Sequence, residues 1–187
     1  MNDKLNRLLD HLETFLPTPL TEQDWKNAKA FRWQKRDSIF GSIGFLKPVK
    51  HLSDISFNDL KHIDRQRDAI IENTQHFVQK RPANNILLTG ARGTGKSSLI
   101  KACLNQFASQ NLRLVEVDKD HLADLPDITE LLAVRPERFI VFCDDLSFED
   151  GESGYKAMKS ALDGSVSAAG QNVLIYATSN RRHLLPE

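Results

Sequence analysis

The chain has 187 residues, and its 25 Lys and Arg residues balance 25 Asp and Glu residues, so the formal net charge is zero. This length fits one domain with a sizeable core, and the balanced charge excludes the basic field typical of many nucleic-acid-binding proteins, so a nucleic-acid partner is not indicated. No segment is apolar for long enough to cross a bilayer, no signal-peptide core is present, and the two cysteines lie in apolar stretches, so we expect a cytoplasmic protein with reduced thiols and no membrane contact.

The first predicted elements are helical. Apolar residues recur at helical spacing over residues 3–15, which predicts an amphipathic helix that ends before Pro17. Thr21 is suited to be an N-cap, and a second helix is predicted over 22–33. The stretch 30–36 mixes aromatic and basic residues. It fits either a surface for nucleic acid or a partner, or a helix that packs its aromatic side chains while its cations stay in water, and we favour packing.

Residues 41–48 contain two glycines and a proline, and they are the best candidate for a linker. We therefore divide the chain into a helical N-terminal extension, residues 1–47, and a core, residues 48–187. The core is predicted to contain a helix over about 64–80, which Pro82 ends.

A strand, a glycine-rich loop and a helix follow in direct succession. The apolar run 86–88 is consistent with a strand buried on both faces. The pattern G-x-x-x-x-G-K-S runs from Gly90 to Ser97, and behind it apolar residues recur at helical spacing at Leu99, Ile100, Cys103, Leu104 and Phe107. This order of elements favours a phosphate-binding loop over the alternative, a plain glycine turn between a strand and a helix.

The residue types of the loop suit a polyphosphate. Glycines allow the unusual backbone angles that aim several N–H groups at one point, and the start of the helix adds its positive end. Lys96 can reach the β- and γ-phosphates as a point charge, and the Ser97 hydroxyl can ligate Mg²⁺. We expect the nucleotide to contact Gly90, Ala91, Arg92, Gly93, Thr94, Gly95, Lys96, Ser97 and Ser98.

Downstream, apolar runs alternate with helical patterns. Strands are predicted over 112–117, 139–143 and 173–177, with short helical segments between the first two and a helix over 155–168 between the last two. Strands that alternate with helices predict a parallel α/β sheet with right-handed crossovers.

Polar side chains stand where two of these strands end, at the edge of a parallel sheet that faces a ligand. Asp144 is expected to hold Mg²⁺, directly or through water, and Asp145 to act as the base that orients or polarises a water molecule. Asn180 can hold that water or contact the γ-phosphate. The alternatives are capping or turn roles for all three residues. Arg181 and Arg182 could reach a phosphate in a neighbouring subunit or be solvated, and we favour solvation.

Three segments together resemble AAA+ ATPases: G-A-R-G-T-G-K-S-S, F-I-V-F-C-D-D-L-S-F-E and I-Y-A-T-S-N-R-R-H-L-L-P-E. More closely, the chain from about Trp25 to Glu187 is similar to the bacterial AAA-type ATP-binding proteins catalogued as a domain of unknown function. The resemblance implies that the loop is Walker A, that Asp144 and Asp145 are the Walker B pair, and that Asn180 is sensor one.

The resemblance also implies that Ile63 and Asp64 contact adenine or ribose. Two features depart from the AAA+ pattern. Asp145 stands where AAA+ proteins usually have Glu, one methylene longer, so hydrolysis is expected to be slow or to use a shifted water molecule. The resemblance further implies a fifth strand, an arginine finger, sensor two and a helical lid beyond Glu187, and without that strand the edge of the phosphate-loop strand is expected to be exposed.

The sequence therefore predicts a three-layer α/β P-loop NTPase fold of the AAA+ type, without its C-terminal part, and with a helical N-terminal extension. Our first functional hypothesis is Mg²⁺-dependent ATP hydrolysis by Lys96, Asp145 and Asn180, coupled to remodelling of an unknown protein partner. The second is a nucleotide-sensing binding module with little or no turnover. A small-molecule phosphoryl transferase is disfavoured because no second substrate motif is present. The lack of an N-K-x-D segment favours adenine over guanine, and the resemblance implies ring-shaped homo-oligomers.

Overall fold

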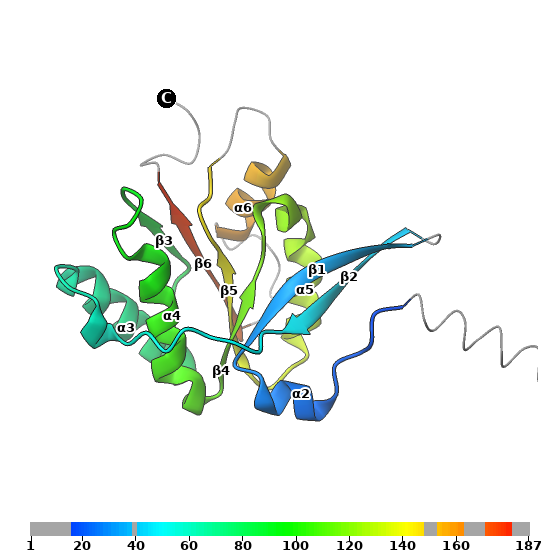
Figure 1. Ribbon diagram of the computed structural model, residues 1–187, viewed down its shortest axis with the longest axis horizontal. Coiled ribbons are helices and arrows are strands. Elements are labelled where there is room, and N and C mark those ends of the chain that lie inside the picture. Colours follow the sequence, from blue (N-terminus) through cyan, green and yellow to red (C-terminus); the bar gives the residue numbers. More distant parts are fainter. Residues whose placement is uncertain (1–15, 39–40, 148–152, 163–170, 181–187) are drawn as a thin grey trace, which may run out of the picture.

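The computed structural model describes residues 16–38, 41–147, 153–162 and 171–180. Its centre is a six-stranded sheet with the order β2-β1-β4-β5-β6-β3 (Figure 1). β1 and β2 pair antiparallel, and every other neighbouring pair is parallel. The strands are β1 (Ala30–Ser38), β2 (Gly41–Pro48), β3 (Ile86–Thr89), β4 (Leu112–Glu116), β5 (Arg138–Cys143) and β6 (Val173–Ser179). The predicted α/β fold with a mainly parallel sheet is confirmed.

Helices cover both faces of the sheet, so the fold has three layers (Figure 1). α3 and α4 pack on one face, whereas α5 and α6 pack on the other. The helices are α2 (Glu22–Asn27), α3 (Asp64–Val78), α4 (Lys96–Phe107), α5 (Leu125–Ala133) and α6 (Ser153–Leu162), and short 3₁₀ helices are η1 (Phe57–Asp59), η2 (Ala108–Gln110) and η3 (Lys119–Asp124). The part of the helix predicted over 155–168 that follows α6 lies outside the described residues.

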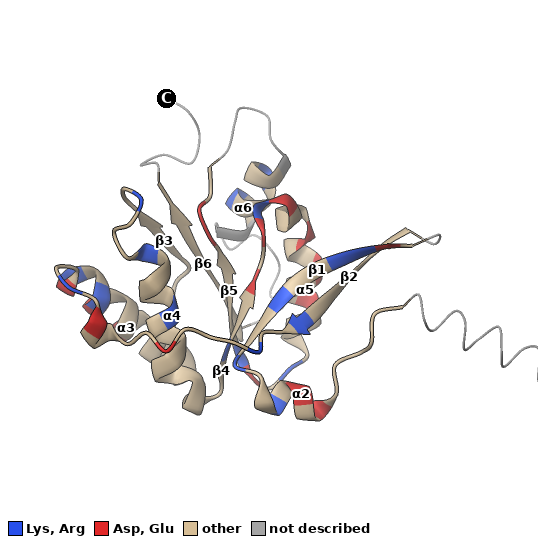
Figure 2. Cartoon of the chain, in the orientation of Figure 1, with Lys and Arg blue, Asp and Glu red and all other residues tan. Residues whose placement is uncertain are grey.

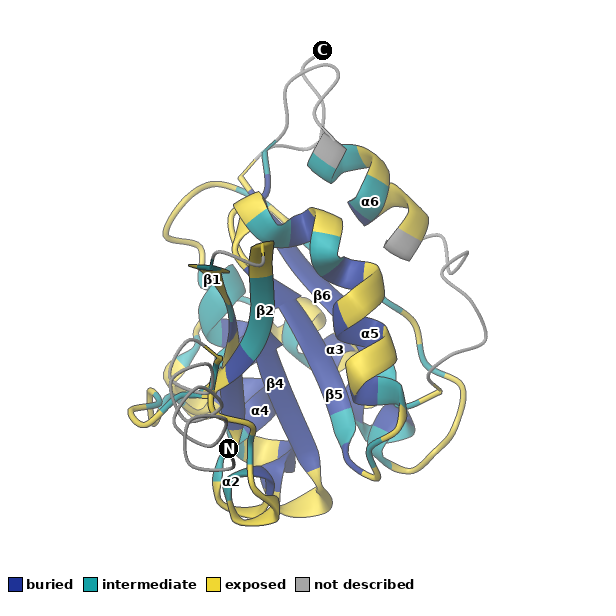
Figure 3. Cartoon of the chain, turned by 90° about the vertical axis from the view of Figure 1, so that its right-hand side faces the viewer, coloured by how far each residue is buried: buried dark blue, intermediate teal, exposed yellow. Residues whose placement is uncertain are grey.

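β5 lies in the middle of the sheet and is buried along most of its length (Figure 3). Phe139, Val141 and Cys143 pack in the cluster on the α5 side, and Ile140 and Phe142 in the cluster on the α4 side. Successive strand side chains point to opposite faces, so a strand with helices on both sides must be apolar throughout. This explains the continuous apolar run that predicted a central strand.

The face predicted for α4 is also confirmed. The five apolar residues predicted for this face are all buried against the sheet and α3: Leu99, Ile100, Cys103, Leu104 and Phe107. This packing fixes the start of α4, where the glycine-rich loop ends.

The helix predicted over 22–33 is wrong in its second half. Thr21 is the N-cap, as predicted, but α2 ends at Asn27 and the chain continues as β1. Phe31 and Trp33 are two residues apart and pack in the same cluster on the α5 side. Their spacing of two is that of a strand, and pairing with β4 supplies the hydrogen bonds that decide between helix and strand.

Two of the three basic residues of β1 are paired with acids from elsewhere in the chain, and the third, Arg36, donates to the carbonyl oxygen of Leu16. Arg32 forms an ion pair with Glu116 at 2.7 Å, and Lys35 forms one with Asp124 at 2.9 Å. Basic and acidic residues are interspersed along α2, α3 and β1 (Figure 2). The aromatic and basic stretch therefore serves packing between β1 and its neighbours.

Residues 41–48 form β2, the second strand of a hairpin, and not the predicted linker. A Cβ atom on Gly44 would stand 2.0 Å from Cζ2 of Trp33, so this position must be glycine for the indole to lie across the strand. The glycines that suggested a flexible connection therefore include one that is required for close packing.

Consequently, the described part of the predicted helical extension, residues 1–47, consists of one short helix and two strands that join the main sheet. The helix predicted over 3–15 lies outside the described residues. The division of the chain at residue 48 remains a prediction.

β3, the strand before the glycine-rich loop, is an edge strand, and its predicted burial on both faces is wrong because its side chains are alternately half-buried and exposed. Among the described strands it pairs only with β6. Ile86 and Leu88 pack against the cluster on the α4 side, but Leu87 points to the other face and is 37% exposed. An apolar run alone does not reveal whether both faces of a strand are covered.

Candidate phosphate-binding site

The loop between β3 and α4 has a backbone that favours glycine. The φ angle is +81° at Gly93 and +85° at Gly95, in the left-handed region where a side chain is strained. α4 begins directly after Gly95, and no acidic residue occupies its first turn. Its unpaired N–H groups and positive end therefore face the loop without an internal counter-charge, which is the arrangement that binds anions.

The Lys96 ammonium lies inside this loop. Its Nζ donates hydrogen bonds to the carbonyl oxygens of Gly90 at 2.7 Å and Ala91 at 2.8 Å, and to Oδ1 of Asn180 at 3.0 Å. All three acceptors are neutral, and the ammonium has no acidic partner among the described residues. A phosphate oxygen would replace neutral acceptors with a charged one, and charge-assisted hydrogen bonds are stronger.

Ser97 and Asp144 meet at the mouth of the loop. The Ser97 hydroxyl donates to Oδ1 of Asp144 at 2.6 Å, although the two residues are far apart in the sequence. Both are oxygen ligands of the kind that Mg²⁺ takes, and Mg²⁺ commonly keeps several waters with one or two protein carboxylates. Among the described residues, no group of three or more His, Cys, Asp or Glu side chains could hold a metal by itself. A metal here would therefore depend on the phosphates and water.

Thr178 holds both aspartates in place. Its hydroxyl donates to Oδ1 of Asp144 at 2.5 Å and accepts from the main-chain N–H of Asp145 at 2.8 Å. Asp145 has a φ of +53°, a conformation that Asp tolerates better than most residues. Its carboxylate accepts a hydrogen bond from Nδ2 of Asn180. The structure thus brings together the predicted Lys96, Asp145 and Asn180.

The chain matches one known protein family over most of its length. Residues 26–187 match the family described as "Protein of unknown function (DUF815)". The chain belongs to this family. No curated protein matches it. The chain is also similar to the solved "Structure of C. elegans PCH-2", with 22% sequence identity and a TM-score of 0.47, over 69% of this chain and 38% of that chain. The match therefore spans well under half of that chain.

Within the described residues of this DUF815 chain, no helix has the length and apolar character needed to span a membrane.

A cavity of about 240 Å³ opens beside the loop of this DUF815 chain. Its apolar walls come from Ile63, Leu88 and Leu99, and its polar walls from Gln66 and the loop. Ile63 is close to the loop, because its Cδ1 would be 3.8 Å from a Cβ on Gly95. An apolar cleft next to a phosphate loop suits a flat aromatic base, and the contact of Ile63 with adenine or ribose remains a prediction.

Asp64 is not brought to this cavity. Its carboxylate forms an ion pair with Arg67 at 2.7 Å, is 72% exposed, and lines a neighbouring cavity of about 480 Å³. The sequence reasoning missed Gln66, which follows Ile63 by three residues and so lies on the same face of α3. Helical spacing from Ile63 could have found it.

Thr178 was also missed as a site residue. Parallel pairing of Cys143 with Ala177 places Thr178 next to Asp144, so the register of β5 and β6 carries the signal. Arg92 is exposed in the loop, and Ser98 is partly buried in the first turn of α4. Arg181 and Arg182 lie outside the described residues.

Proposed function

We propose that this chain binds ATP with Mg²⁺ and hydrolyses it by a P-loop mechanism of the AAA+ type. The observation that carries the proposal is the 2.6 Å contact between the Ser97 hydroxyl and the Asp144 carboxylate beside the loop. These two side chains come from different strand-to-helix units, and a metal–triphosphate complex is the ligand that uses both together with the loop amides.

Each residue has a distinct role in this mechanism. Ser97 and Asp144 would hold Mg²⁺, which when bound neutralises charge on the β- and γ-phosphate oxygens. Lys96 and the loop amides stabilise the charge on the phosphoryl group during transfer. Asp145 accepts the proton of the attacking water, and Asn180, which donates to that carboxylate, orients the water.

The second candidate is a nucleotide-sensing module with little or no turnover. Asp145 is one methylene shorter than the usual Glu, and its carboxylate is already hydrogen-bonded to Asn180. Both features favour slow or absent hydrolysis while leaving the phosphate contacts intact. Measuring phosphate release from Mg²⁺–ATP separates the two candidates, since only the first predicts turnover that depends on Asp145.

Nucleotide binding itself is tested by thermal unfolding. Ligand at about one hundred times its Kd stabilises a protein by about 2.7 kcal/mol, which for a chain of this size raises Tm by about 5–11 °C. The Lys96→Ala variant should lose this shift. The matched control is Lys101→Ala, on the same helix but lining a different cavity, which should keep it. No shift in the wild-type protein would refute nucleotide binding.

The role of Asp145 is tested with Asp145→Asn. Asn tolerates the +53° φ angle as well as Asp does, so the fold should survive. The variant should keep the ATP-induced Tm shift and lose phosphate release. An unchanged rate of release would rule out Asp145 as the base, and an absent rate in wild type would leave the sensing module as the function.

The proposal also includes an oligomeric state, a partner, a location and the bounds of the nucleotide-binding unit. We propose a ring-shaped homo-oligomer and a protein partner that the nucleotide cycle acts on, in the cytoplasm, with residues 48–187 as the nucleotide-binding unit. Ile63 contacts the base. Size-exclusion chromatography with light scattering, with and without Mg²⁺–ATP, tests oligomer formation, and competition with GTP tests the preference for adenine.

A further inference from the structure

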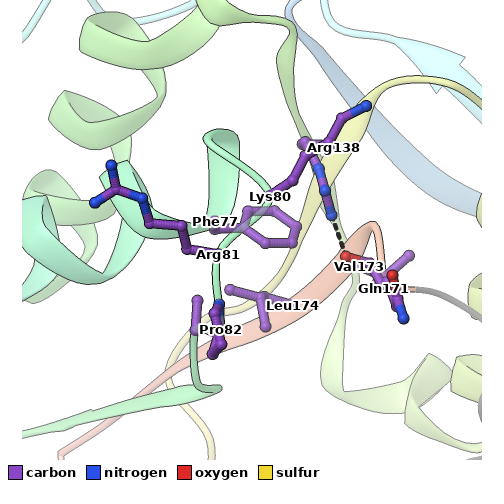
Figure 4. A pocket seen from close by; sticks show the side chains of 9 residues that line it. Phe77, Lys80, Arg81, Pro82, Arg138, Gln171, Val173 and Leu174 are labelled. Carbon is purple, nitrogen blue, oxygen red and sulfur yellow. Dashed lines mark hydrogen bonds between the residues drawn. The ribbon is translucent and has the colours of Figure 1, made fainter.

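A second cavity lies at the opposite end of the sheet from the phosphate loop. It measures about 410 Å³ and is formed where α3 ends and where β5 and β6 begin (Figure 4). Phe77, Pro82 and Leu174 supply apolar walls, and Lys80 and Arg138 supply cations. The residues that line it include none of those that line the cavity beside the phosphate loop.

Arg138 is the central feature of this cavity. Its guanidinium lies 5.1 Å from the centroid of the Phe77 ring, and its Nη1 donates to the carbonyl oxygen of Gln171. Burial lowers the pKa of Arg138, and no charged neighbour raises it again. Among the described residues, Arg138 has no ion pair, and no acidic residue lines the cavity. None of the polar atoms of Arg138 is buried without a partner, so the remaining N–H donors of this guanidinium face the solvent-filled cavity and are free to receive an anion.

Lys80 adds a second cation in an unusual backbone conformation. Its φ is +61°. At the end of α3, the main-chain N–H of Lys80 donates a hydrogen bond to the carbonyl oxygen of Phe77, and that of Arg81 donates one to the carbonyl oxygen of His76. This is the position where helices usually place glycine, so a lysine here costs backbone energy. The cation itself complements the negative end of α3, but its ammonium donates no hydrogen bond to any described residue. Figure 4 shows the Arg81 side chain directed away from Arg138.

We propose that this cavity binds a small amphipathic carboxylic acid. Arg138 and Lys80 hold the carboxylate, and the apolar part of the ligand packs against Phe77, Pro82 and Leu174. A phosphate is less suited, because no helix begins among the residues that line the cavity, and a helix N-terminus is what commonly holds a dianion.

The experiment is an NMR titration of the ¹⁵N-labelled chain with hexanoate, compared with acetate and with the neutral hexanamide. Hexanoate should shift the amide signals of Lys80, Arg81 and Leu174 in a saturable way, with a Kd of about millimolar, as expected for a ligand this small. Acetate, which lacks the apolar part, and hexanamide, which lacks the charge, should each bind at least about tenfold more weakly.

Two variants test the cations. Arg138→Gln should weaken hexanoate at least about tenfold, because hydrogen bonds to a charged group are lost. Lys80→Gly should weaken it about threefold or more while raising Tm, since glycine relieves the positive φ, so this loss cannot be attributed to unfolding. Lys61→Gln, a cation lining another cavity, is the matched control and should bind normally. The proposal is overturned if hexanoate gives no saturable shift, if hexanamide binds equally well, or if Lys80→Gly and Arg138→Gln both bind as wild type does.

Discussion

Replacing Thr178 with valine removes one hydroxyl that connects the two aspartates of the candidate site. Valine has nearly the same shape as threonine, so the packing around the side chain stays. The hydroxyl is the donor to Asp144 at 2.5 Å and the acceptor from the Asp145 N–H at 2.8 Å. Thr178 is only 1% exposed, whereas both aspartates are exposed, so water can take over only part of the two hydrogen bonds.

The expected loss follows from these two contacts. A hydrogen bond to a charged group contributes about 1.5–3 kcal/mol, and a hydrogen bond between neutral groups, such as that from the Asp145 N–H, contributes about 0.5–1.5 kcal/mol. The two values do not add fully, since Asp144 keeps its contact with Ser97. We expect a loss of about 3 kcal/mol, which corresponds to a fall in Tm of about 6–12 °C for a chain of this length.

Thermal unfolding followed by circular dichroism measures the effect, with urea unfolding as an independent check. Thr178→Ser is the control, because it keeps the hydroxyl and loses one methyl group, at a cost of about 1 kcal/mol. If Thr178→Val melts within about 2 °C of Thr178→Ser, the smallest shift expected for 1 kcal/mol, the hydroxyl does not hold the aspartates and our account of the site is wrong.

Three further predictions concern the rest of the fold. Gly44→Ala should cost about 2–3 kcal/mol in urea unfolding because its Cβ would overlap the Trp33 indole, and a change as small as that of Ser42→Ala on the same strand would contradict this packing. Although burial alone would raise the pKa of Asp124, hydrogen bonds from a lysine and a tryptophan lower it. The stability that this carboxylate contributes is therefore full above about pH 4 and is lost as the pH falls through the folded pKa, so Asp124→Asn should be less stable than wild type at about pH 7 and close to it below the folded pKa. Burial raises the pKa of the Cys103 and Cys143 thiols to about 12, so neither should react with a disulfide reagent at about pH 8 until denaturant is added, and rapid reaction of the folded chain would contradict their burial.

Several elements were predictable because their signals are local. The start of α2 is set by the Thr21 cap, and the buried face of α4 is set by apolar residues at helical spacing. β5 was predictable from five consecutive apolar residues, a run that is typical of a strand covered on both faces. In each case, the type of element is indicated by residues that lie close together in the sequence.

The misassigned elements depend on partners that are distant in sequence. Phe31 and Trp33 fit a helix as well as a strand until pairing of β1 with β4 selects the strand. Leu87 is an apolar residue in an apolar run and is exposed, because it belongs to neither of the two apolar clusters that cover the faces of the sheet. Asp64 follows Ile63 directly, but its carboxylate pairs with Arg67 and lines a neighbouring cavity, and its contact with adenine or ribose remains a prediction.

The sequence by itself determined that a glycine-rich loop would connect a strand to a helix with a lysine and a serine at its start, because backbone freedom and helix geometry are properties of short segments. Only the tertiary structure decided that Asp144 would reach Ser97, and that Thr178 would join the aspartates. Those contacts follow from the order and register of parallel strands, which are set by pairing and burial across the whole sheet.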